Sequence, residues 1–310
     1  MDLYRKDFER FNFRYLRNTT VISACYFLWF GFTTGLRIDH FSFYFILLVG
    51  FYAHPISRRL IMGLSVFAFY SFLYDSHKVF PNYLYNTVHV SEPYFMEKAL
   101  FGFMHNGVMV TPNEYFSSNN IPLIDFLSGF FYLCWMPVPV ILAIYLIWTD
   151  RPMALRFSLA FLFVNLVGWI IYYGYPAAAP WYVEKYGFTE NFTLMGDAAG
   201  LTRFDDVINY PLFEKMYTKA SNVFAALPSM HSAYPVVAFA YSLRAKLGWI
   251  NILFAIVMGG IWFAAVYTNH HYIIDVLLGI LVAVVGIWLF ELIYRKTILK
   301  DLVAKWAQRF

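Results

Sequence analysis

The chain has 310 residues, of which 60% are hydrophobic and 14% charged, and its mean hydropathy is +0.54. Soluble domains carry about 25% charged residues, so this composition excludes an ordinary water-soluble fold. The net charge of +4 is too small to indicate nucleic-acid binding, and the two cysteines, both in apolar runs, give no support to a disulfide framework or a cysteine metal site.

Apolar runs long enough to cross a bilayer follow one another along the chain. A spanning helix needs about 20 mostly apolar residues, and backbone in lipid has to satisfy its own hydrogen bonds, so each run predicts a helix. The eight runs cover residues 20–36, 41–57, 60–75, 123–148, 155–174, 229–244, 249–268 and 272–294. The second and third are short, and a re-entrant hairpin is the alternative for them. The predicted fold class is therefore all-α, a polytopic membrane protein with about eight transmembrane segments.

No internal repeat or flexible linker divides the chain, so one membrane domain is expected. The polar lead before the first run predicts a retained span rather than a cleaved signal peptide. Residues 91–104 mix charges with bulky apolar groups, which indicates an amphipathic helix in the headgroup region or a helix packed over the mouth of the bundle. The predicted parts are a cytoplasmic amphipathic lead (1–19), two to three N-terminal transmembrane segments (20–75), a non-cytoplasmic loop with an interfacial helix (76–122), a helical core (123–294) and a basic cytoplasmic tail (295–310).

The placement of lysine and arginine predicts the orientation in the membrane. Most of the 23 Lys and Arg residues fall in the lead, in the tail and in the turns at 58–59, 151–156 and 244–246. Cytoplasmic segments carry such an excess of positive charge. Both termini are therefore expected in the cytoplasm, and the two long loops, 76–122 and 175–228, on the opposite side.

Ionisable residues gather at the non-cytoplasmic ends of the last three runs. His231 opens the sixth run, and His271 lies in the turn that joins the seventh run to the eighth. His271 and Asp275 are four residues apart, so they share one face of a helix. A carboxylate beside an imidazole fixes its tautomer and leaves the other nitrogen free as a nucleophile. The pattern predicts His271 as a nucleophile oriented by Asp275, with His231 as proton donor and acceptor.

Two neighbouring polar residues extend this candidate site. His270 faces away from Asp275, which makes it a poorer nucleophile and a candidate for substrate binding. Ser229 and the free N–H groups at the start of the sixth helix are candidates to hold a phosphate. A lone histidine at a helix mouth is more often interfacial packing, and a lone His–Asp pair is more often structural. Both contexts together on one side of the membrane favour catalysis.

These residues also resemble the motifs of a known family. Pro228-Ser229-x-His231 followed by His271-x-x-x-Asp275 is similar to the second and third motifs of the type 2 phosphatidic acid phosphatase (PAP2) superfamily. The resemblance is closest to its inositol phosphorylceramide synthase branch, and it implies that the core 123–294 is a six-helix catalytic core of the PAP2 type. The stretches that carry it are 175–182, 195–205 and 268–275, with a weaker echo at 97–102.

The chain departs from the superfamily phosphatases at their cationic positions. They carry a lysine and an arginine in the first motif, where this chain has only the 175–182 stretch, and an arginine in the third, where it has Ala264-Ala265. Guanidinium groups pair strongly with phosphate, and a monoester dianion needs more of them than a singly charged diester. The departure therefore favours a diester substrate. The remaining candidate phosphate ligands are Arg203, Lys215 and Lys219, for which ordinary solvated loop cations are the alternative.

The resemblance implies further substrate-binding residues in the loop 175–228. Asp197 and Asp205 lie in the stretch that is similar to the family's downstream loop. Pro180, Trp181 and Tyr182 are candidates to line a headgroup pocket, where an aromatic face suits the apolar side of a polyol ring. Interfacial anchoring, which is common for Trp and Tyr at helix ends, is the alternative for this last group.

Taken together, the resemblance implies a lipid phosphotransferase that moves a phosphoinositol headgroup from phosphatidylinositol to a ceramide-type lipid through a phosphohistidine. No cofactor, metal or nucleic acid is expected. A lipid phosphatase of the same superfamily is one alternative, and a transporter or scaffold that only binds is another. Short tails are typical of a bacterial inner-membrane enzyme, and a Golgi membrane is the eukaryotic alternative. The sequence leaves open the exact donor, the acceptor, the oligomeric state and any partner subunit.

Overall fold

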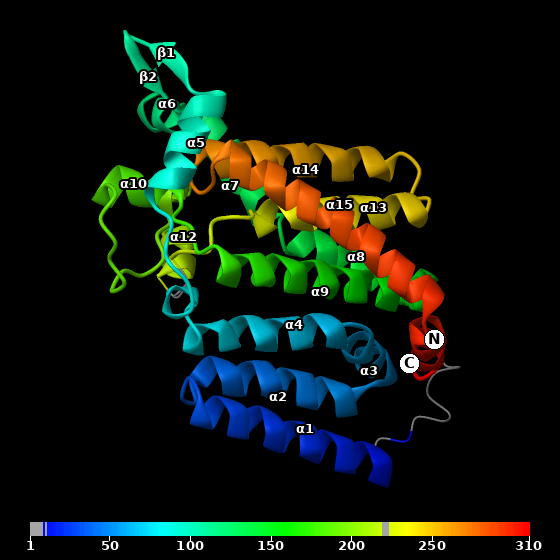
Figure 1. Ribbon diagram of the computed structural model, residues 1–310. Helices are drawn as coiled ribbons and strands as arrows, with labels where there is room; N and C mark the ends of the chain where they lie inside the picture. Colours follow the sequence, from blue (N-terminus) through cyan, green and yellow to red (C-terminus); the bar gives the residue numbers. More distant parts are fainter. Residues whose placement is uncertain (1–8, 10, 219–222) are drawn as a thin grey trace. The chain divides into compact units, whose positions relative to one another are not determined.

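The computed structural model describes residues 9, 11–218 and 223–310, and the regular secondary structure of these residues is helical apart from one short hairpin (Figure 1). Most of the first half of the predicted lead, residues 1–8 and 10, and the candidate phosphate ligand Lys219 lie outside the described residues. The elements up to residue 149 are α1 (Phe13–Phe32), α2 (Ile38–Ala53), α3 (Pro55–Gly63), α4 (Ser65–Ser76), the one-turn helices η2 (His77–Val79) and η3 (Asn82–Leu84), α5 (Ser91–Phe101), β1 (Phe103–His105), β2 (Val108–Val110), α6 (Pro112–Ser118), α7 (Pro122–Leu133) and α8 (Pro137–Thr149). Those that follow are α9 (Arg151–Gly174), α10 (Pro180–Tyr186), η4 (Ala199–Leu201), α11 (Thr202–Ile208), α12 (Leu212–Tyr217), α13 (Met230–Arg244), α14 (Ile250–Tyr267), α15 (Ile273–Lys296) and α16 (Leu299–Ala307).

Each of the eight predicted apolar runs is mainly helical, which confirms the all-α prediction, but the runs 60–75 and 123–148 are each divided between two helices. Among the described residues, α9, α14 and α15 are long and apolar enough to cross a membrane, and counting the bent pairs α3–α4 and α7–α8 as single spans gives five. The bends measure 54° and 41°. In the second pair α8 begins with Pro137, which has no N–H to continue the hydrogen bonds of α7. The helices α2 and α13 are shorter than a full span, at 16 and 15 residues.

The helices group into two compact units. The first contains the residues up to Phe80 together with 143–158 and 298–310, and the second contains 81–142 and 159–297. The predicted core 123–294 therefore contributes one segment to the first unit, because the boundaries fall inside α8 and α9. All the candidate catalytic residues belong to the second unit.

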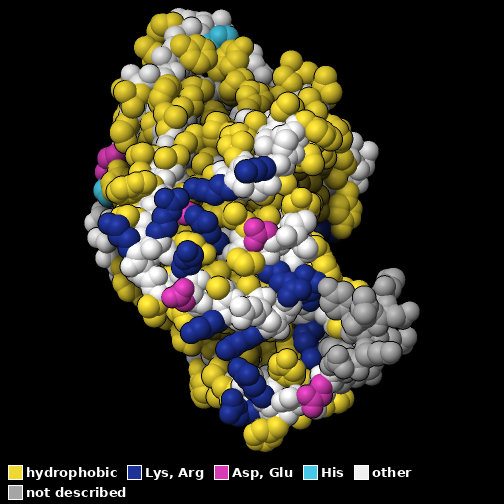
Figure 2. Space-filling view, turned by 90° about the vertical axis from the view of Figure 1, so that its right-hand side faces the viewer, with side chains coloured by type: hydrophobic (Ala, Val, Ile, Leu, Met, Phe, Trp, Pro, Cys, Tyr) yellow, Lys and Arg dark blue, Asp and Glu magenta, His cyan; other side chains and the backbone are white. Residues whose placement is uncertain are grey.

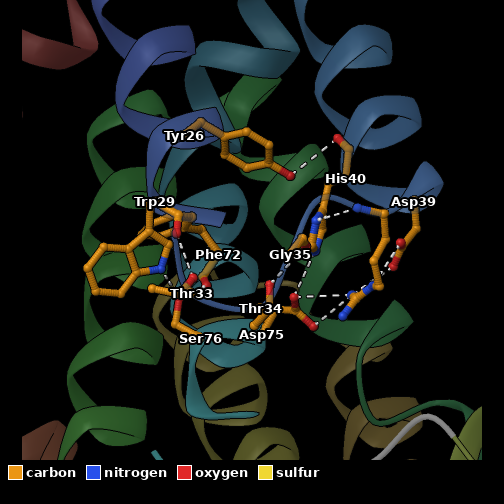
Figure 3. A network of polar contacts seen from close by, with 11 residues as sticks. Tyr26, Trp29, Thr33, Thr34, Gly35, Asp39, His40, Phe72, Asp75 and Ser76 are labelled. Atoms are coloured by element: carbon orange, nitrogen blue, oxygen red, sulfur yellow. Dashed lines mark hydrogen bonds and ion pairs between the residues drawn. The ribbon is translucent and has the colours of Figure 1, made fainter. Parts of the chain in front are cut away.

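In the first unit, a polar cluster ties the turn between α1 and α2 to the end of α4 (Figure 3). The guanidinium of Arg37 binds Asp39 at 2.9 Å and Asp75 at 3.2 Å. The buried ring of His40 accepts a hydrogen bond from the backbone N–H of Arg37 at 3.3 Å and lies 2.9 Å from Asp75 Oδ2. Because each buried polar group has a partner, the cluster joins the three helices at this end without a large cost of desolvation.

In the second unit, α13 packs between α14 and α15, and α14 also packs on α7. Its core includes Tyr132 of α7, Phe204 of α11, Phe213 of α12 and the pair Ala264–Ala265 of α14. The small alanines let the aromatic rings lie close to the α14 backbone. This packing brings α7 and the loop helices α11 and α12 to the C-terminal end of α14, where the candidate site begins.

The stretch 175–182 begins as extended chain that pairs with two other segments. Ala177 forms parallel bridges with His89 on one side and Ala225 on the other. Ala177, Ala178 and Ala179 are buried, and their small side chains allow three chain segments to lie side by side. The stretch therefore connects the segment before α5 with the segment before α13.

Candidate active site

A tight turn between α14 and α15 holds His271. The backbone N–H groups of His270 and His271 both donate to the carbonyl of Ala265, at 3.1 and 2.9 Å. Asn269 has a positive φ of 62°, a conformation that asparagine tolerates better than most residues. The turn ends at Tyr272, the N-cap of α15. His271 therefore lies in the turn, directly before this cap.

His231 is the second residue of α13, and α15 fixes the start of that helix. Ser229 is the N-cap, and its Oγ accepts a hydrogen bond from the N–H of Ser232 at 3.3 Å. The backbone N–H of Ser229 donates to the carbonyl of Asp275 at 2.9 Å. A Cβ at Gly279 would overlap the carbonyl oxygen of Ser229, so glycine is required for the two helices to meet here. Ser229 serves this junction, and its role toward phosphate stays a prediction.

The two candidate catalytic histidines meet. His231 Nδ1 lies 3.3 Å from His271 Nε2, although 40 residues separate them, and the ring centroids are 5.6 Å apart. The two imidazoles therefore lie side by side, and their catalytic roles stay predictions. Both nitrogens face the same point, which suits a nucleophile and a proton carrier that act on one reacting group.

Asp275 lies beside His271 but also has a structural contact. Its Oδ2 is 3.5 Å from His271 Nδ1, within ion-pair distance. The same oxygen accepts the backbone N–H of Tyr272 at 2.9 Å, which completes the cap of α15. Within the described residues, His271 Nδ1 has no hydrogen-bond partner. The predicted neighbours are therefore in contact, and the shorter bond of the carboxylate goes to the backbone.

Burial keeps the histidines of the turn neutral. Desolvation lowers the pKa of His271 to about 4, and desolvation, with a smaller effect of His271, lowers the pKa of His270 to about 3. A neutral imidazole has a free lone pair at neutral pH, as a nucleophile needs. His271 is therefore in the form that the predicted role requires.

His270 is fixed by a different set of contacts. Its Nε2 lies 2.9 Å from the carbonyl oxygen of Ala198, to which it donates. Its ring lies 5.3 Å from the ring of Tyr132 and 4.7 Å from that of Tyr217. His270 therefore links the catalytic turn to the loop around η4 and to α7 and α12.

Tyr132 lies beside His231, and no sequence motif predicts this contact. Its ring is fully buried, and its hydroxyl lies 3.1 Å from His231 Nδ1. The hydroxyl of Tyr217 donates to that of Tyr132 at 3.2 Å. Tyr132 lies in an apolar run of a chain that is 22% aromatic, so nothing in the sequence distinguishes it. The fold adds it to the site as a third polar group.

Arg203 is paired with a buried carboxylate. Its Nε lies 2.6 Å from Asp125 Oδ1, and its terminal nitrogen donates to the carbonyl of Tyr267 at 3.0 Å. The latter contact places Arg203 at the end of α14, just before the turn that carries His271. Lys215 instead lies over the ring of Tyr210, at 4.6 Å from the centroid. Arg203 therefore contacts α14, the helix that leads into the catalytic turn, whereas Lys215 lies beside Tyr210.

The two candidate aspartates organise the loop. Asp197 accepts hydrogen bonds from Lys185 Nζ at 2.7 Å and from the N–H of Ala199 at 2.6 Å. Asp205 is buried, and its two oxygens accept the N–H groups of Phe213 and Glu214, each at 3.0 Å. Both carboxylates therefore have protein partners that shape the chain between α10 and α12.

The aromatic residues of α10 are packed inside the same region. Pro180 occupies the first turn, and Trp181 and Tyr182 are 5% and 0% exposed. The N–H of Trp181 donates to the carbonyl of Asn269 at 3.1 Å, and the Tyr182 hydroxyl donates to the carbonyl of Thr189 at 2.8 Å. Side chains this buried pack the loop, and Trp181 joins α10 to the catalytic turn.

Two further residues of the second unit contact the catalytic turn, one from α5 and one from α6. Glu97 of α5 and Asn113 of α6 both bond to backbone groups of residues 266–274. Glu97 belongs to the stretch 97–102, which resembles the family weakly, whereas no sequence pattern singled out Asn113. Within the described ranges, no group of three His, Cys, Asp or Glu residues is arranged to hold a metal ion.

Comparisons with known proteins identify relatives of this chain. A phosphoinositol dihydroceramide synthase of Bacteroides thetaiotaomicron is 46% identical over 272 residues, which cover 87% of this chain and 89% of the relative. An inositol phosphorylceramide synthase of Candida albicans is 29% identical over 189 residues, 56% of this chain and 39% of the relative. The catalytic subunit of the Saccharomyces cerevisiae inositol phosphorylceramide synthase is 30% identical over 121 residues, 38% of this chain and 29% of that protein. No solved structure matches the chain. The family model of the PAP2 superfamily matches residues 103–289, and the chain belongs to that superfamily.

Proposed function

We propose that the chain is a membrane phosphotransferase that moves a phosphoinositol headgroup from phosphatidylinositol to a dihydroceramide-type lipid. The approach of His231 Nδ1 to His271 Nε2, at 3.3 Å, carries the proposal, because it supplies a nucleophile and a proton carrier at one point. The bacterial relative is named a phosphoinositol dihydroceramide synthase, and the two chains are similar over nearly their whole lengths. That relative supports both the reaction class and the substrate class.

In the first step, Nε2 of neutral His271 forms a bond to the phosphorus of the donor lipid. The bond from phosphorus to the diacylglycerol oxygen breaks, and His231 gives its proton to that departing oxygen. The headgroup remains on His271 as a phosphohistidine. Asp275, 3.5 Å from the other nitrogen of His271, stabilises the positive charge that develops on the ring.

In the second step, His231 removes the proton from a hydroxyl of the acceptor lipid. The acceptor oxygen attacks phosphorus, the bond to His271 breaks, and both histidines return to their starting states. Dividing the transfer into two displacements lets one base serve both steps. Keeping water out while a lipid hydroxyl enters decides between transfer and hydrolysis.

The charge around the site suits a phosphodiester. Ala264 and Ala265 are fully buried where the superfamily phosphatases carry a Ser-Arg pair, and Arg203 is already paired with Asp125. A singly charged diester needs fewer cations than a monoester dianion. The phosphate is proposed to lie at the start of α13 near Ser229, where the helix dipole favours an anion, with Arg203 as the candidate cation.

The other residues of the predicted site are proposed to act on the substrate through the loop that they hold. Five of them hydrogen-bond to protein partners in the loop or in the catalytic turn, and Pro180 starts α10, so a change in any of them moves the walls of the site. They are His270, Asp197, Asp205, Pro180, Trp181 and Tyr182.

The proposed orientation places the catalytic turn on the non-cytoplasmic side and both termini in the cytoplasm. In the second unit, Arg244 ends α13 and Arg295 and Lys296 end α15, at the opposite ends of these helices from His231 and Asp275. The face drawn in Figure 2 shows many Lys and Arg side chains. The excess of positive charge in cytoplasmic segments supports this orientation. The bacterial relative supports a bacterial inner membrane.

The helix α5 and the hairpin β1–β2 are proposed to rest on the lipid surface. Phe95, Met96 and Leu100 of α5 are exposed, as are Met104 and Val108 of the hairpin. In Figure 1 the hairpin extends sideways from the ends of α14 and α15. Large apolar side chains on an extramembrane element are favourable where they meet the headgroup and acyl boundary.

The function is tested with the purified full chain in liposomes that contain phosphatidylinositol with a tritiated inositol ring and dihydroceramide. Tritium is expected to move to a dihydroceramide-based lipid in the wild type, while His271→Ala transfers none and forms no covalent headgroup adduct. Label that appears only in water would mean that water is the acceptor. Transfer by His271→Ala at a near-normal rate would show that the nucleophile is assigned wrongly.

A further inference from the structure

The helices α5 and α6 are tied together into one brace. The Tyr94 hydroxyl of α5 donates to Glu114 Oε1 of α6 at 2.7 Å, and Lys98 Nζ donates to the same hydroxyl at 2.8 Å. Thr111 and Glu114 form a capping box that fixes the first turn of α6. Figure 1 shows both helices beside the ends of α14 and α15 that carry the catalytic turn.

From this brace, Glu97 reaches the start of α15. Its side chain has no exposed surface, and its two oxygens accept the backbone N–H groups of Ile273 and Ile274 at 3.0 and 3.1 Å. These are the first two residues of α15, and their N–H groups have no partner inside the helix. A buried carboxylate is costly unless it is hydrogen-bonded, and here two N–H groups and the helix dipole offset part of that cost. A residue needed only for packing would be apolar at this position.

From the same brace, Asn113 reaches the other end of the turn. Its side chain is 2% exposed, and its Nδ2 donates to the carbonyls of Val266 and His271, each at 3.0 Å. The first carbonyl belongs to the last turn of α14, and the second to the candidate nucleophile itself. Asn113 therefore joins the helix before the turn to the residue that the turn presents.

We propose that Glu97 and Asn113 are positioning residues that hold the catalytic turn at both ends and so keep His271 opposite His231. The proposal concerns the reaction proposed above and rests on it for its kinetic consequence. Neither residue touches the reacting nitrogens. Their contacts fix backbone groups within five residues of His271, and a displacement of about 1 Å in a catalytic group can lower a rate by about 100-fold.

The kinetic test uses Glu97→Ala and Asn113→Ala in the full chain, with phosphatidylinositol and dihydroceramide in liposomes. We expect kcat to fall by about 10- to 100-fold while the apparent KM for either lipid changes by less than about threefold, because the turn moves and the lipid contacts stay. Glu97→Gln, which keeps one acceptor oxygen, should recover part of the lost rate. Matched controls are Glu92→Ala on the exposed face of α5 and Asn119→Ala at the end of α6, both expected near the wild-type rate.

Hydrogen exchange provides a readout that does not depend on activity. In Glu97→Ala, the amides of Ile273 and Ile274 should exchange faster than in the wild type, while amides in the middle of α9 stay protected. If the alanine variant fails to fold, Glu97→Gln decides the question with the same two measurements. Unchanged exchange at these amides, or a rate loss no larger than in Glu92→Ala, would overturn the proposal. A wild type that transfers no headgroup would refute the proposed function, whereas exchange would still decide whether Glu97 holds the turn.

Discussion

Replacing Tyr132 by phenylalanine tests the participation of a residue that only the fold brings to the site. The change removes one hydroxyl and keeps the buried ring, so the packing against His231 and His270, at centroid distances of 4.9 and 5.3 Å, is preserved. The lost contacts are the 3.1 Å approach to His231 Nδ1 and the 3.2 Å hydrogen bond from Tyr217. The variant therefore isolates the effect of one polar group.

The expected magnitude follows from the charge that His231 carries during the reaction. A neutral hydrogen bond contributes about 0.5–1.5 kcal/mol and one to a charged group about 1.5–3 kcal/mol. In the proposed reaction, His231 is protonated when it gives a proton to the leaving oxygen and again when it takes one from the acceptor. The hydroxyl of Tyr132 should thus stabilise the protonated ring, and losing about 1.5–3 kcal/mol corresponds to a decrease in kcat of about 10- to 150-fold.

The assay is headgroup transfer in liposomes under saturating phosphatidylinositol and dihydroceramide, with thermal unfolding measured on the same preparations. Tyr217→Phe is the matched control, because its hydroxyl is one hydrogen bond further from His231, and it should lower kcat less than Tyr132→Phe does. A folded Tyr132→Phe protein whose kcat stays within twofold of the wild type would refute the reasoning.

Three further predictions concern the supports of the site. Asp125→Ala should lower the free energy of unfolding by about 3–5 kcal/mol, because it leaves the partly buried Arg203 without its carboxylate. The measurement is chemical denaturation in detergent, and an unfolding free energy equal to that of the wild type would contradict the prediction. Gly279→Ala should push α13 away from α15, destabilise the protein by about 1–3 kcal/mol and reduce headgroup transfer. Gly259→Ala, at a position that faces open space, should be tolerated. Equal unfolding midpoints for the two variants would disprove the close contact. Burial raises the pKa of Glu97 to about 7, so between its ordinary value of 4.5 and about 7 the folded state binds the proton more tightly and this group's contribution to stability falls as pH rises. Glu97→Gln lacks that loss, and its melting temperature relative to the wild type should rise between pH 5 and pH 8; a difference that does not vary with pH would speak against a buried, ionising carboxylate.

Local sequence determined which parts of the chain are helical and where several of them end. Runs such as 155–174 and 272–294 are apolar over the length that a bilayer requires, and a backbone in lipid has to form its own hydrogen bonds. Pro137 marks the start of α8, and Ser229 caps α13. These features depend on residues that are close in the chain, so composition and spacing suffice to predict them.

Local spacing predicted only part of the catalytic geometry. His271 and Asp275 are indeed neighbours, but His271 lies in the turn before α15, and the nearer partner of the carboxylate is a backbone N–H. The spacing of four residues was the right signal for contact. It did not reveal that the carboxylate makes its shorter contact with the backbone N–H of Tyr272, because the same residues fit a helix and a capped turn.

Tertiary structure decided everything that joins distant segments. His231 meets His271 across 40 residues, Tyr132 meets His231 across 99, and Glu97 meets the start of α15 across 176. Gly279 lets α13 and α15 pack closely enough for His231 to reach His271, and the brace of α5 and α6 supports the contact of Glu97 with α15. Such contacts are set by which helix faces pack together. A hydrophobic run specifies that a helix is buried in lipid, but it does not specify which neighbour it meets or which of its many aromatic side chains will lie beside a histidine.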